Sequence, residues 1–410
     1  MLPKGWKRST LGDCTKLLSG STPSKERQDY WSGEFPWVTV KDMKTPWLLR
    51  TGLTLTQAGK AAASVAPANS ILVVTRGMAL LKDLPISLAM RDVAFNQDIK
   101  AIVPNQGLDA RFLAYQLQSK KHAVLDMVDT AGHGTGKLDT DLLKSVDLVM
   151  PPIPEQRRIA QILSTWDQAI STAERLLANS QRCTRDLMVS MLSGRRRFPG
   201  FTGKWRYVDF DAVFERVTRK NSTQNTNVLT ISAEHGLISQ RDYFNKSVAS
   251  ANLSGYTLLY RYDFAYNKSY STGYPMGAIK PLLDYDAGVV SSLYLCFKLR
   301  DDVDADFDFF RHYFEAGLLN QEIEGVAQEG ARNHGLLNVS VTDFFKLQLH
   351  IPTAPEQRRI AEVINVARAE EARLQAQVQA LRQEKSALMS QLLTGKRRVK
   401  LPEAETEAQA

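Results

Sequence analysis

The sequence predicts an α+β protein in which two globular blocks alternate with two long helices related by an internal repeat. Residues 154–160 have the sequence PEQRRIA, and residues 355–361 repeat it 201 positions later. About 44 residues follow this offset without a gap, and each copy ends in a basic cluster. The segment before each copy is rich in strand-forming and turn residues. A repeat this long is a duplicated unit and not a solenoid period, so we expect a pseudo-twofold arrangement.

These patterns divide the chain into five segments. The expected globular blocks are residues 1–150 and 199–350, and the expected helices are residues 151–198 and 351–400. Residues 401–410 form an acidic tail that we expect to be disordered. A chain of 410 residues is too long for one ordinary core, which agrees with more than one unit.

The two repeated segments have the spacing of apolar residues that is typical of a coiled coil. Pro154 and Pro355 suit the first turn of a helix, and Gly194 and Gly395 suit its C-terminal cap. The basic residues beside each cap are expected to complement the dipole of their own helix. A helix of about 40 residues, about 60 Å long, cannot bury its apolar seam alone. We therefore expect the two copies to pair as an antiparallel coiled coil; the alternative is that each helix packs on its own globular block.

The apolar seam residues expected at this helix–helix contact are Ile159, Leu163, Trp166, Ile170, Leu177, Ile360, Ile364, Leu374, Val378, Leu381 and Leu388. Four polar seam residues are expected to help fix the register, namely Ser180, Thr184, Glu371 and Lys385.

The globular blocks are expected to contain both strands and helices. Residues 70–75 and 289–297 are predicted to be buried strands, and residues 111–125 and 307–323 to be helices. Cations, amides, hydroxyls and aromatics mix in residues 19–25, 75–77, 96–98 and 261–280. Such side chains suit phosphates and base edges. Alternating aromatics are also typical of a strand in a core, so for residues 261–280 both interpretations stay open.

Composition and motifs favour a binding protein over an enzyme. The net charge of +8 makes a phosphate-bearing partner plausible. Residues 134–137, GTGK, lack two features of a phosphate-binding loop, because Ala131 replaces a glycine and Leu138 replaces Ser or Thr. We expect no metal site, no disulfide framework and no catalytic residue. No signal peptide or membrane helix is expected, so a cytoplasmic protein without a membrane partner is predicted.

Two variable blocks, each followed by a PEQRRIA-headed helix, resemble the specificity subunit of type I restriction–modification systems. The resemblance covers nearly the whole chain, and the duplicated helix is its most specific element. It extends to the motifs at residues 20–24, Trp31, residues 36–38, Asp42, residues 71–77, 96–100, 263–269 and 274–275.

The resemblance implies that each globular block is a target recognition domain for one half of a bipartite, asymmetric site on double-stranded DNA. The helices would set the spacer between the half-sites and dock two copies of a methyltransferase subunit. Restriction and translocase subunits would complete the assembly. This chain would bind no cofactor itself; S-adenosylmethionine, ATP and Mg²⁺ are expected on the partner subunits.

The residues expected to contact DNA are Thr22, Ser24, Lys25, Lys41, Arg76, Asn96, Gln97, Lys268, Ser269, Tyr270 and Tyr274. Two other classes of function are weighed against this one. A coiled-coil adaptor would assemble proteins without sequence-specific DNA binding, and a nuclease would show metal-dependent cleavage by the isolated chain.

Overall fold

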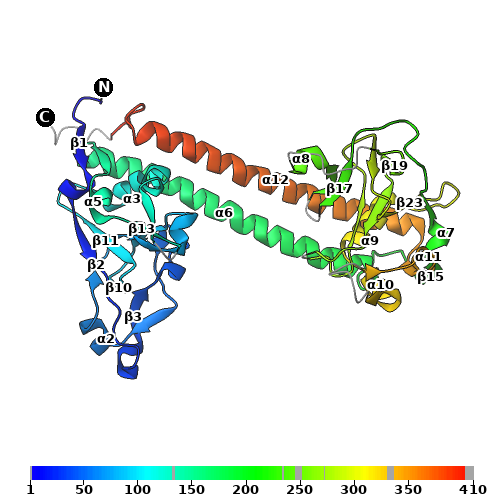
Figure 1. The fold of residues 1–410 in the computed structure, drawn as a ribbon, viewed down its shortest axis with the longest axis horizontal. Coiled ribbons are helices and arrows are strands. Elements are labelled where there is room, and N and C mark those ends of the chain that lie inside the picture. Colours follow the sequence, from blue (N-terminus) through cyan, green and yellow to red (C-terminus); the bar gives the residue numbers. More distant parts are fainter. Residues whose placement is uncertain are drawn as a thin grey trace. The chain divides into compact units, whose positions relative to one another are not determined.

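The protein is described here from a computed structural model of the 410-residue chain. The structure describes residues 2–131, 134–232, 235–244, 252–271, 273–329 and 337–401. It contains two compact units (Figure 1): unit 1 comprises Met1–Ala173 with Gln377–Ala410, and unit 2 comprises Glu174–Ala376. Both units mix helices and sheets, which confirms the predicted α+β class. Of the expected tail, only Leu401 lies within the described residues.

Unit 1 is built around a five-stranded sheet with the order β2-β11-β7-β9-β4 and a four-stranded sheet with the order β5-β3-β10-β6. Its strands are β1 (Lys7–Thr10), β2 (Thr15–Ser19), β3 (Trp31–Val38), β4 (Trp47–Leu48), β5 (Leu53–Leu55), β6 (Val65–Ala66), β7 (Ile71–Val74), β8 (Arg76–Gly77), β9 (Ile86–Ala89), β10 (Val93–Phe95), β11 (Ile99–Pro104), β12 (Val128–Ala131), β13 (Thr135–Leu138) and β14 (Asp147–Met150). Its short helices are α1 (Leu11–Cys14), α2 (Gln57–Ala61), α3 (Ala110–Ser119), α4 (Lys121–Leu125) and α5 (Thr140–Lys144), with 3-10 turns η1 (Gln28–Tyr30), η2 (Val40–Asp42) and η3 (Met78–Leu81).

The predicted strand at residues 70–75 is β7, and all four of its side chains are buried in the core of unit 1. The helix predicted over residues 111–125 is interrupted. It forms α3, which Asp109 caps by accepting a hydrogen bond from the Phe112 amide, and the separate helix α4 after Lys120.

Unit 2 has a four-stranded sheet with the order β16-β23-β20-β21. Its strands are β15 (Arg206–Asp209), β16 (Phe214–Arg216), β17 (Leu229–Ser232), β18 (Gly236–Ser239), β19 (Thr257–Tyr260), β20 (Phe264–Asn267), β21 (Ala278–Pro281), β22 (Ala287–Val290), β23 (Leu295–Leu299), β24 (Gln328–Glu329), β25 (Leu337–Asn338) and β26 (Gln348–Ile351). Its short helices are α7 (Phe210–Val213), α8 (Gln240–Phe244), α9 (Phe307–Glu315), α10 (Asn320–Val326) and α11 (Val341–Phe345). Interlocking phenylalanines fill the core, among them Phe210, Phe214, Phe264, Phe297 and Phe310.

Two expectations for unit 2 are wrong in detail. Residues 289–297 form no single strand, because a turn at Ser291 ends β22 and the chain re-enters a different sheet as β23. Ser291 holds that turn by accepting hydrogen bonds from the amides of Leu293 and Tyr294. The helix predicted over residues 307–323 ends early, since Gly317 takes a left-handed conformation with φ of +70° between α9 and α10.

The repeated segments form two long helices, α6 (Ile153–Leu192) and α12 (Ala354–Leu392). In unit 1, Glu155 of α6 lies at Arg398, and Asp167 lies 2.5 Å from the ammonium nitrogen of Lys385. The partner number falls as the α6 number rises, so this pairing is antiparallel. In unit 2, Met188 meets Arg368 and Arg197 meets Glu356, which is again antiparallel.

The seam residues have two different surroundings. Those near the helix starts are built into the globular cores: Ile159 and Leu163 belong to the core of unit 1, and Ile360 and Ile364 to that of unit 2. Leu374 and Val378 are also buried, whereas Trp166, Ile170, Leu177, Leu381 and Leu388 are half-buried. Helix pairing and packing on the preceding block therefore both occur.

The basic cluster behind each helix does not serve only the dipole of its own helix. Arg398 donates two hydrogen bonds to Glu155, at 3.1 and 2.7 Å, and Arg197 donates two to Glu356, at 2.8 and 2.7 Å. Both carboxylates are almost completely buried. Each ion pair thus ties the end of one long helix to the start of the other, and the two pairs are related by the 201-residue repeat. Among the described residues, no helix is long and apolar enough to cross a membrane.

Candidate DNA-recognition site

Unit 1 brings together two polar segments that lie far apart in the sequence. The amide of Ser21 donates to the carbonyl of Phe95 at 2.9 Å, and the hydroxyl of Thr22 donates to Gln97 Oε1 at 2.5 Å. A side chain at Gly20 would stand 1.9 Å from the carbonyl oxygen of Asn96, so only glycine permits this approach. The expected DNA contacts Thr22, Asn96 and Gln97 therefore share one local surface.

Arg76 lies beside this surface, and a second cation faces it. The amides of Thr75 and Arg76 both donate to the carbonyl of Asp98, which follows Gln97 directly. In the pairing of β8 with β13, Arg76 stands opposite Lys137, and both side chains are exposed. Directly opposed residues of an antiparallel pair project on the same face, and two like charges there are destabilising. An anion bound at this point would relieve the repulsion.

Lys137 is a candidate that sequence reasoning missed. It is the lysine of the GTGK segment that fails the phosphate-loop pattern. Its cross-strand position next to Arg76 depends on pairing between strands 60 residues apart, which no local pattern reports. The signal in the sequence was a lysine flanked by glycine in a short strand-like segment.

The remaining candidates of unit 1 lie on loops near the same strands. Lys25 lines a shallow pocket of about 390 Å³ with Gln28, Trp31 and Leu53. The indole nitrogen of Trp31 donates to the carbonyl of Ser24 at 3.0 Å, which fixes the ring at the pocket wall. Lys41 is exposed in η2, whose preceding strand β3 pairs with β10.

Some candidate DNA contacts of unit 2 are hydrogen-bonded within the fold, and others are exposed. Lys268 donates to the carbonyl of Val339 at 3.0 Å, and the amide of Ser269 donates to Asn267 Oδ1 at 3.1 Å. Tyr270 is 64% exposed, so its ring is accessible to a ligand. Tyr266, by contrast, is completely buried in the phenylalanine core. Within residues 261–280 the core interpretation is therefore confirmed for Tyr266, and the DNA contact stays a prediction for Tyr270.

Tyr274 belongs to a half-buried polar network. Its hydroxyl donates to Glu315 at 2.7 Å and accepts from the ammonium of Lys280 at 2.7 Å. Lys280 also forms an ion pair with Glu315. Burial, and secondly the hydrogen bond to Glu315, raises the pKa of Tyr274. The network joins β21 to α9, so the hydroxyl of Tyr274 already has a structural role.

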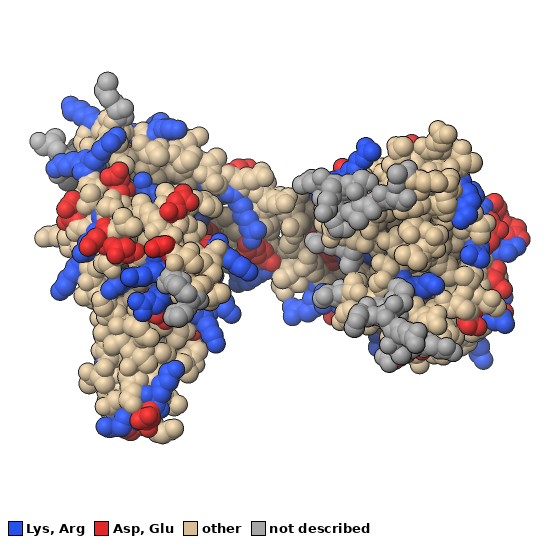
Figure 2. All heavy atoms as spheres, in the orientation of Figure 1, with Lys and Arg blue, Asp and Glu red and all other residues tan. Residues whose placement is uncertain are grey.

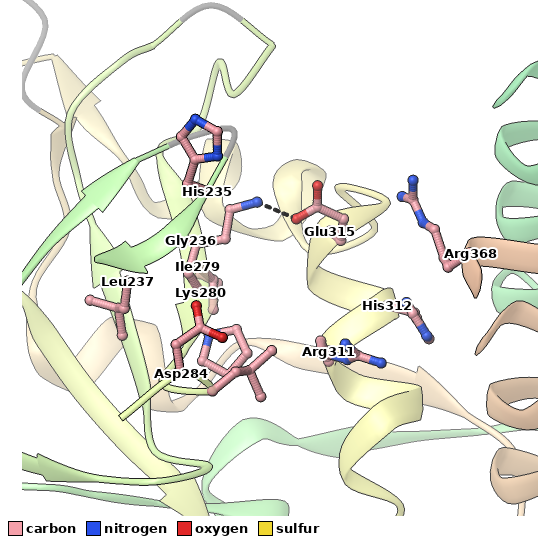
Figure 3. A pocket seen from close by; sticks show the side chains of 12 residues that line it. His235, Gly236, Leu237, Ile279, Lys280, Asp284, Arg311, His312, Glu315 and Arg368 are labelled. Carbon is pink, nitrogen blue, oxygen red and sulfur yellow. Dashed lines mark hydrogen bonds and ion pairs between the residues drawn. The ribbon is translucent and has the colours of Figure 1, made fainter. Parts of the chain in front are cut away.

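A pocket of about 340 Å³ lies next to this network (Figure 3). Lys280, Arg311 and Arg368 contribute positive charge to its lining, and Glu315 and Asp284 contribute negative charge. Each of the three cations already has an acidic partner: Lys280 pairs with Glu315, Arg311 with Asp308, and Arg368 with Glu371. The pocket is therefore close to electrically neutral and is a poor anion site.

Charge is distributed widely over the visible face of both units. Figure 2 shows Lys and Arg side chains interspersed with Asp and Glu. This face shows no continuous basic stripe among its described residues, so local groups such as Arg76 with Lys137 are better indicators of a DNA-binding surface. No cluster of three or more His, Cys, Asp or Glu suited to a metal ion occurs within the described ranges.

Comparison with known proteins finds similarity over about two fifths of the chain. Residues 3–179 match the family model of the type I restriction modification DNA specificity domain. The chain is 32% identical over 165 residues to the EcoR124I/EcoR124II specificity subunit of Escherichia coli, covering 40% of each chain. It is 28% identical over 183 residues to the MjaIX specificity subunit of Methanocaldococcus jannaschii, covering 42% of this chain and 40% of the relative. The chain thus spans about two fifths of the length of these relatives.

Solved structures extend the likeness to the whole fold. The S subunit of a type I restriction–modification system from M. genitalium matches with a TM-score of 0.58 at 12% identity, over 95% of this chain and 96% of that one. A chain from a structure of the type I system described for its complex assembly and conformational transition matches with a TM-score of 0.58 at 15% identity, over 96% and 99%. Residues 3–179 therefore match the type I restriction modification DNA specificity domain, and the chain has the fold of the solved type I specificity subunits that the sequence resemblance predicted.

Proposed function

We propose that this chain is the sequence-specific DNA-binding subunit of a type I restriction–modification complex. Unit 1 and unit 2 each contain one globular block, and each block recognises one half of a bipartite target. The two blocks share no pattern of candidate contact residues, so the two half-sites differ in sequence.

The observation that carries this proposal is the opposed pair of exposed cations Arg76 and Lys137 beside the Thr22–Gln97 contact. Cations supply affinity for phosphates and for guanine, while a side-chain amide such as that of Gln97 matches the edge of adenine. Both ends of the Asn96 amide are bonded to Asp98, so Asn96 would have to exchange these bonds to contact a base. These side chains lie in the segment that matches the specificity-domain model.

The partners and cofactors follow from the proposed role. The long helices dock two copies of a methyltransferase subunit and set the spacer between half-sites, and restriction and translocase subunits join the complex. Those partners carry S-adenosylmethionine, ATP and Mg²⁺, and this chain contributes no catalytic residue. The complex acts on double-stranded DNA in the cytoplasm.

The test is co-expression with the methyltransferase encoded beside this chain, in a host without other DNA modification. Single-molecule sequencing then maps methylated adenines. We expect a bipartite motif that appears only when this chain is present. If a complex of the two proteins forms but selects no DNA sequence, the coiled-coil adaptor is the better description. Metal-dependent cleavage by the isolated chain would instead support a nuclease.

A further inference from the structure

The two copies of the repeat have diverged very unevenly. Residues 161–186 share no identity with residues 362–387 at the 201-residue offset. The seven residues at the start of α6, however, are identical to those at the start of α12. A recent duplication does not explain this contrast, because it would leave identities throughout both helices. The seven positions are therefore under constraint in both copies.

Five of the seven positions have a structural reason to be kept. Pro154 and its copy lie in the first turn of each helix, and Glu155 and its copy form the buried ion pairs. The Gln156 amide donates to the Pro151 carbonyl, and Gln156 Oε1 accepts from the Asp109 amide; Gln357 makes the same contacts in unit 2. Ile159 and Ala160 are buried in the core of unit 1.

The other two positions, Arg157 and Arg158, are exposed in both copies. Among the residues that the structure describes, Arg157 has no hydrogen-bond or ion-pair partner, and Arg158 bonds only Gln161 of its own helix. Their copies Arg358 and Arg359 form ion pairs with Asp304 and Glu362, and all four side chains are at least half exposed. Exposed pairs of this kind contribute about 0–1 kcal/mol. Arg359 also lies over the ring of Phe198, 5.4 Å from its centroid, and Arg158 has no such contact within the described part of the chain.

The acids opposite these arginines are not repeated. Glu362 corresponds to Gln161 in the first copy; both accept a hydrogen bond of 2.9 Å from the arginine three residues earlier, but only Glu362 carries a charge. The stability of this chain therefore does not explain why both copies of the repeat keep two adjacent arginines. A partner that contacts both copies does explain it, because the same contact must then be made twice.

We propose that the two arginine pairs, Arg157 with Arg158 and Arg358 with Arg359, are equivalent docking points for carboxylates on a protein partner that binds once at each pair. The planar guanidinium matches a carboxylate in a bidentate geometry. The inference rests on the proposed function and assigns the contact to the methyltransferase subunit.

The location in unit 1 favours a protein over the DNA target. Arg157 and Arg158 lie in the first turns of α6. This helix begins at Ile153, three residues after the end of β14, and β14 pairs with β1. In Figure 1, β1 and the start of α6 are at one end of unit 1, and β3 with α2 is at the other. The predicted DNA contacts at residues 22–25 precede β3 and not the helix start.

The experiment measures how many methyltransferase subunits bind each full-length variant, using light scattering for stoichiometry and calorimetry for affinity. We expect two subunits on the wild-type chain. Arg157→Ala with Arg158→Ala should weaken one of the two binding events at least tenfold and leave the other unchanged. Arg358→Ala with Arg359→Ala should weaken the opposite event, and the fourfold variant should weaken both. The matched control is Arg175→Ala with Arg182→Ala, two exposed arginines of α6 that the repeat does not keep.

Each alternative result has a separate meaning. Two unchanged binding events in the fourfold variant overturn the docking assignment while the proposed function stands. Unchanged partner binding with a weaker, less salt-dependent affinity for DNA assigns the arginines to phosphates instead. If the wild-type chain binds no methyltransferase, both the docking assignment and the proposed function fail. Thermal unfolding of every variant checks that the fold is intact.

Discussion

At the scale of single residues, Arg76 and Lys137 illustrate how a local cost indicates a binding role. Their side chains are exposed and opposed on one face of an antiparallel pair, where like charges repel. Strand register alone places Arg76 and Lys137 opposite each other, although either cation could lie on a separate face without this repulsion. An anion bound between them would relieve the repulsion.

The first prediction is that Arg76→Ala weakens DNA binding and, where Arg76 contacts a base, relaxes one position of one half-site. A base contact of this kind is worth about 1–3 kcal/mol. Lys137→Ala should weaken binding by a similar or smaller factor without altering the motif, if it contacts only phosphate. The measurements are DNA affinity at two salt concentrations and the methylation motif. Unchanged affinity and motif in both variants would remove the pair from the site.

The second prediction concerns His312, which is buried between α9 and α12. Its Nε2 lies 2.7 Å from Asn365 Oδ1, and Arg311, Asp308 and Arg368 are the charged groups around it. Burial lowers the pKa of His312 in the folded chain, so the ring stays neutral there while the unfolded chain binds a proton near pH 6.5. The stability that depends on neutral His312 is therefore complete above pH 6.5 and is lost as the pH falls below it.

For one proton this loss is at most about 1.4 kcal/mol per pH unit. Urea unfolding at pH 7.5 and pH 5 measures it. His312→Gln should reduce the pH dependence of unit 2, and His122→Gln, at an exposed position, is the control. Equal pH dependence in both variants would show that His312 does not titrate as expected.

At the scale of elements, the ends of the long helices depend on each other. Glu155 accepts two hydrogen bonds from Arg398 and a third, at 3.0 Å, from the indole of Trp6. The start of α6, the end of α12 and the first residues of the chain therefore meet at one buried carboxylate. Glu356 has the same function for Arg197 in unit 2.

The third prediction is that Arg398→Met destabilises unit 1, because it leaves Glu155 buried without its cation. Removing one partner of a fully buried pair costs 3–5 kcal/mol; Arg398 is about half exposed, so we expect about 2–3 kcal/mol. Arg397→Met, at the exposed neighbouring position, should change the stability by less than about 0.5 kcal/mol. Denaturant unfolding compares the two variants. Equal effects would mean that the ion pair has no special role.

At the scale of the whole molecule, the antiparallel contacts make the proposed spacer function testable. The contacts Asp167–Lys385 and Met188–Arg368 lie on either side of the middle of both helices. An insertion in one helix alone would shift one set of contacts against the other. A matched pair of insertions keeps both sets intact.

The fourth prediction uses one heptad inserted after Leu374 together with one inserted after Ala178. Seven helical residues add about 10.5 Å, which corresponds to about three base pairs at 3.4 Å each. Both half-sites should be retained, and the spacer between them should lengthen by about three base pairs. Methylated-motif sequencing measures the spacer directly, and an unchanged spacer would refute the proposal that the helices set its length.

The sequence by itself determined the plan of this protein. The 201-residue repeat and the heptad spacing predict both long helices, and Gly194 and Gly395 do cap them with a left-handed conformation. Periodicity and cap residues are local properties, so they can be recognised in a single sequence. The buried strand β7 was predicted for the same reason, since four consecutive apolar residues need a core.

Tertiary structure decided everything that depends on residues distant in the chain. The turn at Ser291 sends β22 and β23 to different sheets, and the approach of Gly20 to Asn96 creates the surface around Thr22 and Gln97. The opposition of Arg76 and Lys137 is likewise a matter of strand register. Such pairings depend on which apolar surfaces are buried against each other. That burial is a property of the packed molecule and not of any short segment.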